Sequence, residues 1–282
     1  MMYLWHKTAA AEQEEAWQEK LADVAGAVIS AAFQAGRISV DVYTEKAEEA
    51  YVLQALYGGK VSTLPETDWV AATAPENTPP LVIRDRIVIS ASAKAEVLEE
   101  LRTQYPKRII LSFPAEQAFG TGNHATTSTC LRLLCDWVKA RGKSPWTLTD
   151  VGCGTGVLAL AGLKLGAQRA ESFDFDPKAV EVARRNIDRN GGAEGLRLFQ
   201  ADVFEWTPAE QTDVVLANLF STVLQKAFPR LLAAMKPEAV LIISGILRTQ
   251  AEETLAAARA AGLTPVRIIT RGKWTTAQLV RS

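Results

Sequence analysis

The sequence predicts a protein of the α/β class, with a doubly wound parallel sheet as its main element. From about residue 145 onward, short β-branched runs alternate with longer stretches of helical period. A glycine-rich turn at residues 152–156 directly follows the first of these runs. With 282 residues and 48% hydrophobic content, the chain is also long enough to bury a core and to divide into a large and a small domain.

Charge and cysteine content narrow the class of protein. The 31 Lys and Arg residues balance 32 Asp and Glu residues, so no overall positive field exists and no direct nucleic-acid contact is expected, although a local basic patch stays open. The amino terminus lacks the order of a secretory signal, and no apolar run is long enough to cross a bilayer. Three cysteines are too few for a disulfide framework, so we expect a cytoplasmic protein without membrane contact.

Residues 1–70 are expected to form a small amino-terminal α+β domain of the ferredoxin-like kind. Strands are expected at YLWHK, RISVDVYTE and KVSTL, and helical stretches near residues 11–35 and 46–57. Residues 71–110 are interpreted as a linker region, because a proline-bearing stretch leads into a strand-like run. An additional helix is expected at residues 93–108.

Residues 111–282 carry the strand and helix pattern of a Rossmann-like doubly wound sheet. Its first five strands are expected at WTLTDV, ESFDF, LRLFQA, TDVVLANL and AVLIISG, with helical stretches after all but the third. Two further runs, 264–271 and 274–281, are separated only by Gly272 and Lys273. That spacing is too short for a crossover, so an antiparallel hairpin should close a sheet of seven strands.

The glycine-rich turn GCGTG links the first expected strand to an apolar helix. Close backbone approach and a helix amino terminus can meet a ligand at such a position. The third glycine is Gly156, whereas the dinucleotide fingerprint would place it at Val157, so the pattern argues against a nicotinamide cofactor. The alternative is that these glycines only make a tight turn.

An acidic strand end lies at the distance expected for a nucleoside-binding site. The second strand closes on FDFDP, so Asp174 or Asp176 can offer a carboxylate to the two ribose hydroxyls, with Phe175 along a purine. Together with the glycine turn, this strand end resembles the class I S-adenosylmethionine-dependent methyltransferases. The resemblance implies that Gly152 and Gly154 pass under the methionine part of S-adenosylmethionine and that Asp174 holds its ribose.

The fourth expected strand delivers Asn218 at its carboxyl end, beside the expected position of the methyl group. Asparagine often ends strands simply because it tolerates turns. Methyl transfer from a sulfonium is a displacement, in which the enzyme mainly holds a neutral nucleophile in line and removes water. Because an amide carbonyl can accept a hydrogen bond from an incoming amine and aim its lone pair, Asn218 is the candidate catalytic residue for an amine acceptor.

The stretch AFGTGNHATT, residues 118–127, precedes an amphipathic helix that Thr126 or Thr127 could cap. Taken alone, the stretch would be a turn with His124 as a hydrogen-bonded loop residue. A helix ahead of the first strand packs beside it, however, so its amino-terminal loop can cover the cofactor and supply hydroxyl and backbone donors. We therefore expect a lid over the methyl donor.

Five motifs occur in the order found in the bacterial ribosomal protein L11 methyltransferase family, which the chain resembles over roughly residues 110–282. They are PAEQAFGTGNHATT, DVGCGTGVLALAGLKLGA, DFDPKAVEVARRN, DVVLANL and SGIL. The resemblance implies that cofactor contacts fall on Thr127, Gly152, Asp174 and Asn218. Further candidate contacts from the lid, the glycine turn and the second strand end are Phe119, Thr121, Gly154 and Phe175.

The resemblance implies an S-adenosylmethionine-dependent N-methyltransferase whose partner is a protein substrate. It would methylate lysine side chains, the N-terminal amine or both on ribosomal protein L11, which the amino-terminal domain would capture while the linker lets the catalytic domain swing. Residues 1–70 share pattern more than motif with the family, so two alternatives stay open. These are a methyltransferase of the same fold acting on another protein or a small amine, and a non-catalytic nucleoside-binding module. Two distant histidines and three cysteines without CxxC spacing predict no metal site.

Overall fold

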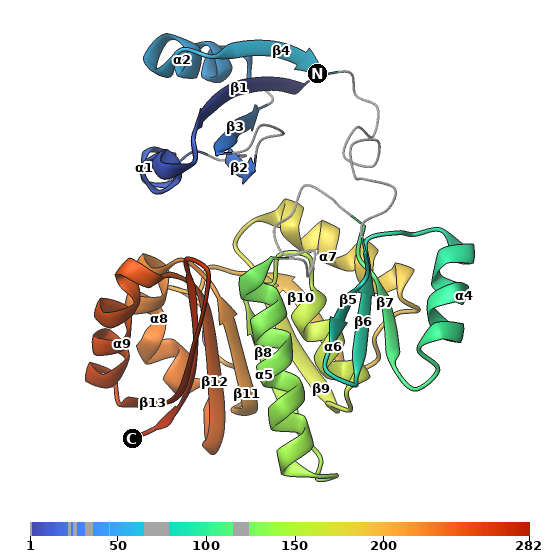
Figure 1. Cartoon of the computed structure of the whole chain (residues 1–282). Helices are drawn as coiled ribbons and strands as arrows, with labels where there is room; N and C mark the ends of the chain where they lie inside the picture. The colour runs from blue at the N-terminus through green and yellow to red at the C-terminus, as the bar shows by residue number, and fades with distance from the viewer. Residues whose placement is uncertain are drawn as a thin grey trace. The chain divides into compact units, whose positions relative to one another are not determined.

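The chain divides into two compact units, Met1–Ala72 and Thr73–Ser282. The computed structural model describes residues 2–21, 24, 27–31, 36–44, 46–64, 79–114 and 124–282 (Figure 1). Among these residues, no helix combines the length and the apolar character needed to cross a membrane.

The first unit is a four-stranded antiparallel sheet with helices in its connections. Its elements are β1 (Met2–Ala10), η1 (Ala11–Gln13), α1 (Glu14–Lys20), β2 (Ala27–Ala31), β3 (Arg37–Thr44), α2 (Ala47–Tyr57) and β4 (Lys60–Leu64). The strands lie in the order β2-β3-β1-β4, and each neighbouring pair is antiparallel. This is the ferredoxin-like arrangement, so the predicted class of the small unit is confirmed.

Residues 11–35 differ from the continuous helical stretch that the sequence predicts there. The helix α1 ends at Lys20, and residues 27–31 form β2, which pairs with β3. A short apolar run such as AVISA suits a strand or a buried helical segment equally well, and the partner strand decides between them. The core of this unit includes Trp5 and Trp17, whose ring centroids lie 6.0 Å apart.

The second unit is built on a seven-stranded sheet. Its elements from α5 onward are α5 (Ala125–Arg141), β8 (Thr147–Val151), α6 (Val157–Lys164), β9 (Arg169–Asp174), α7 (Pro177–Arg189), β10 (Leu196–Gln200), β11 (Thr212–Asn218), α8 (Ser221–Ala233), β12 (Met235–Leu247), η2 (Arg248–Gln250), α9 (Ala251–Ala260), β13 (Leu263–Arg271) and β14 (Trp274–Arg281). The strand order is β10-β9-β8-β11-β12-β14-β13, parallel from β10 to β12 and antiparallel at β14. The predicted Rossmann-like doubly wound sheet with an antiparallel final hairpin is therefore confirmed.

Alternate residues of β11 point to opposite faces of this sheet. Val214 and Leu216 belong to a core cluster with residues of α5 and α6, whereas Val215 and Ala217 belong to a second cluster with residues of α8 and α9. Helices therefore cover both faces of the sheet (Figure 1). Asn218 continues the parity of Val214 and Leu216, so its side chain lies on the face that α5 covers.

A three-stranded sheet occupies part of the segment 71–110 that the sequence indicates as a linker region. Its elements are β5 (Leu81–Ile83), β6 (Ile87–Ser90), α4 (Ala95–Gln104) and β7 (Ile109–Ser112). Ile83, Ile87 and Leu111 are buried in the same core cluster as the apolar residues of α5. These residues are therefore a folded part of the second unit, and the helix expected at residues 93–108 corresponds to α4.

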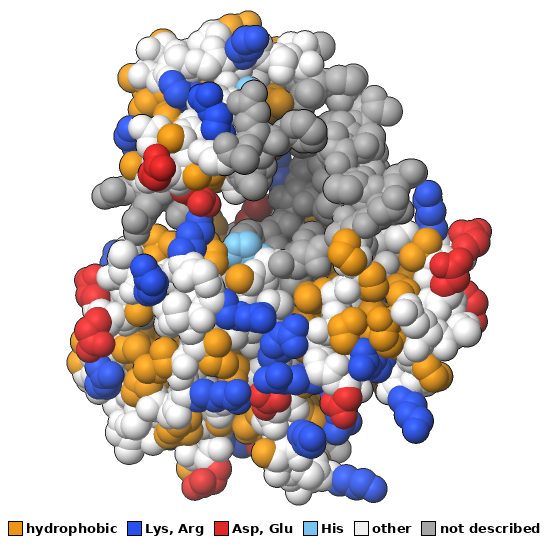
Figure 2. Space-filling model, viewed as in Figure 1, with side chains coloured by type: hydrophobic (Ala, Val, Ile, Leu, Met, Phe, Trp, Pro, Cys, Tyr) orange, Lys and Arg blue, Asp and Glu red, His pale blue; other side chains and the backbone are white. Residues whose placement is uncertain are grey.

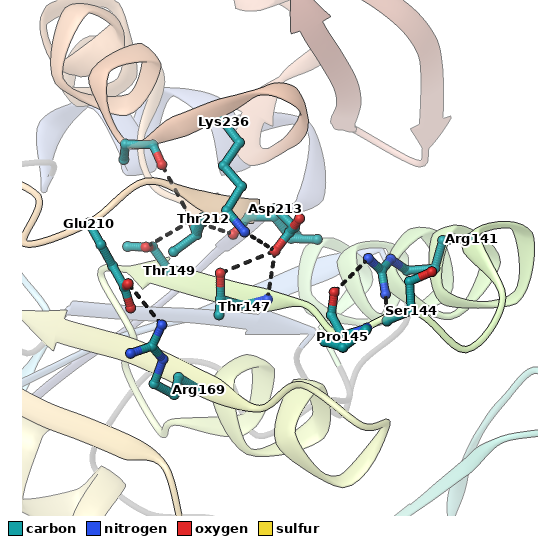
Figure 3. Close-up of polar contacts among 12 residues, drawn as sticks. Arg141, Ser144, Pro145, Thr147, Thr149, Arg169, Glu210, Thr212, Asp213 and Lys236 are labelled. Atoms are coloured by element: carbon teal, nitrogen blue, oxygen red, sulfur yellow. Dashed lines mark hydrogen bonds and ion pairs between the residues drawn. The ribbon is translucent and has the colours of Figure 1, made fainter.

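The amino ends of β8, β11 and β12 are tied together at the edge of the sheet opposite Asn218. The Asp213 carboxylate accepts hydrogen bonds from the Thr147 backbone N–H at 2.8 Å and from Lys236 Nζ at 2.7 Å (Figure 3). The pairing of β11 with β12 shifts register between Thr212 and Val214 and is regular from there to Asn218. This group of contacts, the Asp213 clamp, therefore marks where the regular part of β11 begins.

Ion pairs tie the outer side of α5 to the elements beside it. Asp136 accepts two hydrogen bonds at 2.8 Å from Arg84, in the turn between β5 and β6, and one at 3.0 Å from Arg267 of β13. Figure 2 shows Lys and Arg side chains gathered over α5 and the strands beside it. Because these groups are partly exposed, each pair contributes little to stability, and their main effect is to fix side-chain positions.

Candidate functional site

The glycine turn follows β8 at the carboxyl edge of the large sheet. Gly152, Gly154 and Gly156 have φ angles of 70°, 53° and 78°, a conformation that residues with a side chain rarely adopt. The backbone N–H groups of Gly152 and Cys153 both donate to the carbonyl of Phe173 at 2.9 Å. The turn is therefore fixed to the end of β9, next to the acidic residues that follow this strand.

Two glycines, one in the turn after β8 and one within β12, make room for the residue after Asn218. A Cβ atom on Gly152 would overlap the Leu219 side chain. A Cβ atom on Gly245, whose φ is 83°, would lie 2.9 Å from the carbonyl carbon of Leu219 and still closer to its oxygen. The Leu219 N–H donates to the Ser244 carbonyl at 3.1 Å. The SGIL motif therefore contributes to the site by supporting the backbone at the end of β11.

The carboxylate of Asp174 reaches the glycine turn. One oxygen accepts the Gly154 N–H at 2.9 Å, and the other accepts the Asp176 N–H at 3.0 Å. Asp176 itself caps α7, because its carboxylate accepts the Lys178 N–H at 2.9 Å. Of the two acids that the sequence leaves open, Asp174 thus faces the turn. Burial raises its pKa above the usual range, so a hydrogen-bond donor from a ligand would favour its ionised form.

A second acid, Asp150, is the penultimate residue of β8, two residues before Gly152, and is 1% exposed. Its Oδ2 accepts the Ala159 N–H at 3.1 Å, and its Oδ1 has no hydrogen-bond partner among the described residues. Burial raises the pKa of Asp150 to about 7, and the charge of Asp174 adds to the rise. Two neighbouring acids with raised pKa values favour a ligand that carries positive charge.

Asn218 is held by two hydroxyl groups from the first turn of α5. Its Nδ2 donates to Thr126 Oγ1 and to Thr127 Oγ1, each at 3.3 Å, and both threonines are buried. Its Oδ1 is shielded from solvent and has no hydrogen-bond partner within the described part of the chain. Because a buried carbonyl without a donor is costly, this oxygen is a ready acceptor for an N–H group of a ligand.

The start of α5 differs from the predicted cap at Thr126 or Thr127. His124 is the N-cap residue, and its Nδ1 lies 3.4 Å from the Thr126 N–H nitrogen that donates to it and 2.7 Å from Thr126 Oγ1. Its ring packs edge-on against Trp274, with the centroids 5.1 Å apart. The threonine hydroxyls do not cap, because the first turn of α5 directs them toward Asn218.

The sequence-predicted residues fall into three groups. Those at the carboxyl edge around the glycine turn and the end of β11 are Thr127, Gly152, Gly154, Asp174 and Asn218. Phe175 follows β9 at the same edge and is 69% exposed, with its carbonyl accepting from Gln200 Nε2 at 3.1 Å. Phe119 and Thr121, with the rest of the predicted lid before His124, lie outside the described residues.

Sequence reasoning did not give Thr126 and Asp150 the roles that they have in the site, and it considered Thr126 only as a possible helix cap. Thr126 contacts Asn218 as closely as Thr127 does, and two adjacent hydroxyls at a helix start could have suggested a shared role. Asp150 lies two residues before the glycine turn, and an acid near the end of a buried strand is an unusual residue that signals a ligand.

The arrangement suits a nucleoside with a cationic side chain better than a metal ion. Asp174 can accept from a ribose, Asp150 and Asp174 together favour an ammonium or sulfonium group, and Asn218 offers an acceptor for an amine. Among the described residues, no group of three or more His, Cys, Asp or Glu side chains could hold a metal. The site can therefore bind a charged nucleoside and orient an amine beside it.

The chain is similar to known ribosomal protein L11 methyltransferases. A family profile described as Ribosomal protein L11 methyltransferase (PrmA) matches residues 4–282. The ribosomal protein L11 methyltransferase of Pelotomaculum thermopropionicum is 37% identical over 232 residues, which cover 80% of this chain and 71% of that protein. The protein of the same name from Haemophilus ducreyi is 34% identical over 226 residues, which cover 80% and 67%. A crystal structure of ribosomal protein L11 methylase from Lactobacillus delbrueckii subsp. bulgaricus, 24% identical, shares the fold with a TM-score of 0.58 over 70% of this chain and 95% of that one.

Proposed function

Because the chain belongs to the ribosomal protein L11 methyltransferase family, we propose that it methylates amino groups of ribosomal protein L11. The chain is an S-adenosylmethionine-dependent methyltransferase. The acceptors are lysine side chains, the N-terminal amine or both.

The observation that carries this proposal is the free carbonyl of Asn218. Its amide nitrogen is engaged by Thr126 and Thr127, and its Oδ1 is buried without a partner among the described residues. An amine with one N–H on that oxygen has its lone pair turned away from the bond, so it can attack without being protonated by the protein. A lysine must lose its proton before it attacks, and removal from water favours its neutral form.

S-adenosylmethionine supplies a methyl group on a positively charged sulfur. Asp174 would hold the ribose hydroxyls, because each carboxylate oxygen has accepting capacity beyond its one backbone N–H. The turn from Gly152 to Gly156 would pass under the methionine part, where its backbone approaches a ligand closely. Burial disfavours the negative charge of Asp150, and an ammonium group beside it would favour that charge, so Asp150 would complement the ammonium group.

The amino-terminal domain, residues 1–70, is proposed to recognise the protein substrate. In support, α2 exposes Tyr51, Val52 and Leu56, which are 56%, 55% and 66% accessible. Large apolar side chains grouped on one helix are typical of surfaces that bind another protein. The candidate cofactor contacts belong to the second unit, which leaves the first unit for recognition.

A direct test combines the purified chain, methyl-labelled S-adenosylmethionine and purified ribosomal protein L11, with a cell lysate in a parallel reaction. The label should enter L11 in both reactions. Label in a different protein or in small amines, with none in L11, would overturn the proposed substrate and favour another acceptor for the same fold.

The role of Asn218 is tested by Asn218→Ala. We expect methyl transfer to fall by about 100-fold or more, while the affinity for S-adenosylhomocysteine by calorimetry stays within about tenfold. The matched control is Gln211→Ala, which removes an exposed amide at the other end of the same strand region. Equal losses of binding and turnover in Asn218→Ala would contradict the role.

A further inference from the structure

The two threonines cannot by themselves decide which way the Asn218 amide faces. An asparagine side chain can turn by 180° and exchange its carbonyl oxygen with its NH2 group. A hydroxyl group can either donate or accept, so Thr126 and Thr127 could bind either end of the amide equally well. Something further must fix the polarity, because only one orientation leaves the oxygen for an incoming amine.

His124 supplies that polarity. Its Nδ1 accepts the Thr126 backbone N–H, and a backbone N–H can only donate, so this nitrogen carries no proton. The hydroxyl of Thr126, 2.7 Å from the same nitrogen, must then donate its own proton to it. With its proton used in this way, Thr126 Oγ1 is an acceptor toward Asn218, and it receives the Nδ2 hydrogen at 3.3 Å.

We infer that His124 is a positioning residue of the methyltransferase, which acts through the Thr126 hydroxyl to keep Asn218 with its carbonyl oxygen free for the acceptor amine. The hydrogen bonds run in one direction, from Asn218 Nδ2–H to Thr126 Oγ1–H to His124 Nδ1. The inference rests on the proposed function, because the direction of the amide matters only if an amine is the acceptor.

The surroundings of His124 keep its ring neutral at neutral pH, and so they preserve the direction of these hydrogen bonds. Burial lowers the pKa of His124, and Lys273, in the turn between β13 and β14, lowers it further. The start of α5 adds the positive end of a helix dipole, which also opposes a charged ring. The Trp274 ring of β14 and the hydroxyl of Thr126, which also contact the His124 ring, are uncharged.

Protonation of His124 would reverse the chain of hydrogen bonds. A protonated Nδ1 donates to Thr126 Oγ1, and the hydroxyl proton is then free to turn toward Asn218. The amide would present its oxygen to Thr126 and its NH2 group to the acceptor site, where a donor blocks the lone pair that must attack. The rate should therefore fall in acid for a reason separate from protonation of the acceptor amine.

The test compares the wild type with His124→Asn. The Asn side-chain oxygen occupies the position of Nδ1 and is a good helix cap, but it does not titrate. At pH 8 we expect kcat with L11 within about threefold of the wild type. The acceptor amine titrates in the same way with both proteins, so its effect cancels in the ratio of the wild-type rate to the His124→Asn rate. This ratio should be constant from pH 7 to 9 and should fall about tenfold per pH unit below the His124 pKa.

Thr126→Val and Thr126→Ser test the hydroxyl between the two residues. Valine has the same shape without a hydroxyl, and we expect kcat to fall about tenfold or more with KM for L11 and S-adenosylhomocysteine affinity nearly unchanged. Serine should restore the rate. In 15N-labelled protein, the side-chain NH2 signal of Asn218, identified by its loss in Asn218→Ala, should move in Thr126→Val and stay in place in Thr126→Ser.

The outcomes separate this inference from the proposed function. If the wild type transfers no methyl group to L11, the proposed function is wrong. If the wild type methylates L11 but the rate ratio stays flat below the His124 pKa, measured by NMR titration of its ring, His124 does not position Asn218 and the inference alone is overturned. The same holds if Thr126→Val has the wild-type kcat and the same Asn218 signal.

Discussion

Replacing Gly245 by alanine should impair methyl transfer although this residue is expected to contact neither substrate nor cofactor. The added Cβ would lie 2.9 Å from the Leu219 carbonyl carbon, where an ordinary contact begins at 3.4 Å, and closer still to the carbonyl oxygen. The backbone of Leu219 must therefore retreat by about 0.5 to 1 Å and carry Asn218 with it. A displacement of about 1 Å at the reacting groups can cost about 100-fold, so we expect kcat to fall by about 10- to 100-fold.

Gly142→Ala is the matched control for this variant. Gly142 follows α5 with a φ of 77°, close to the 83° of Gly245, and a Cβ atom on it would meet nothing within 4 Å in the described part of the chain. Both variants place an alanine at a positive φ, and Gly142, with a ψ of −146°, lies in a region that essentially only glycine adopts. Each should therefore lose about 1 to 3 kcal/mol of stability, or about 3 to 9 °C in Tm. Only Gly245→Ala should lose methyl transfer to L11. Wild-type kcat in a folded Gly245→Ala protein would refute the reasoning.

Three further predictions concern the acids and the thiol beside the glycine turn. Asp174→Asn should weaken S-adenosylhomocysteine binding about 10- to 100-fold by calorimetry, because a hydrogen bond to a charged group is lost; an unchanged Kd would contradict its role. Asp150 has a folded-state pKa of about 7 against an ordinary value of about 4, so its contribution to stability is full below pH 4 and is lost as pH rises through 7. Asp150→Asn should therefore raise the free energy of unfolding in urea at pH 8 relative to the wild type, by up to about 4 kcal/mol, but not at pH 4. Equal differences between variant and wild type at both pH values would contradict a raised pKa for Asp150. Cys153 is buried, and its burial together with the charges of Asp150 and Asp174 raises its pKa. Iodoacetamide at pH 8 should therefore leave methyl transfer unchanged. Loss of methyl transfer in proportion to alkylation of Cys153 would show that this thiol is accessible and reactive.

The large sheet could be predicted because its signals are local and repeated. Each β-branched run is followed by a turn and most by a helix, and a parallel sheet brings the carboxyl ends of its strands to one edge. From that rule alone, the glycine turn, Asp174 and Asn218 could be expected near one another although they are dozens of residues apart in the chain. The hairpin at 263–281 followed from the two residues that separate its strands.

The parts that could not be predicted depend on partners distant in sequence. The strand β2 exists because β3 pairs with it, and nothing within AVISA itself distinguishes a strand from a helix. The folding of residues 81–112 onto α5 depends on buried contacts with a helix that follows later in the chain. The cap at His124 was missed for a similar reason, because threonine is the better cap in isolation, and the end of β11 is what draws both threonine hydroxyls inward.

The Asp213 clamp has a consequence for how the length of β11 can vary. Because side chains alternate along a strand, a residue gained or lost between Val214 and Asn218 would exchange the two faces and aim the amide at α8 and α9 instead of α5. A residue gained or lost ahead of Thr212 could be absorbed where the pairing is already irregular. The number of residues between the Asp213 clamp and Asn218 therefore determines which face of the sheet the catalytic amide occupies.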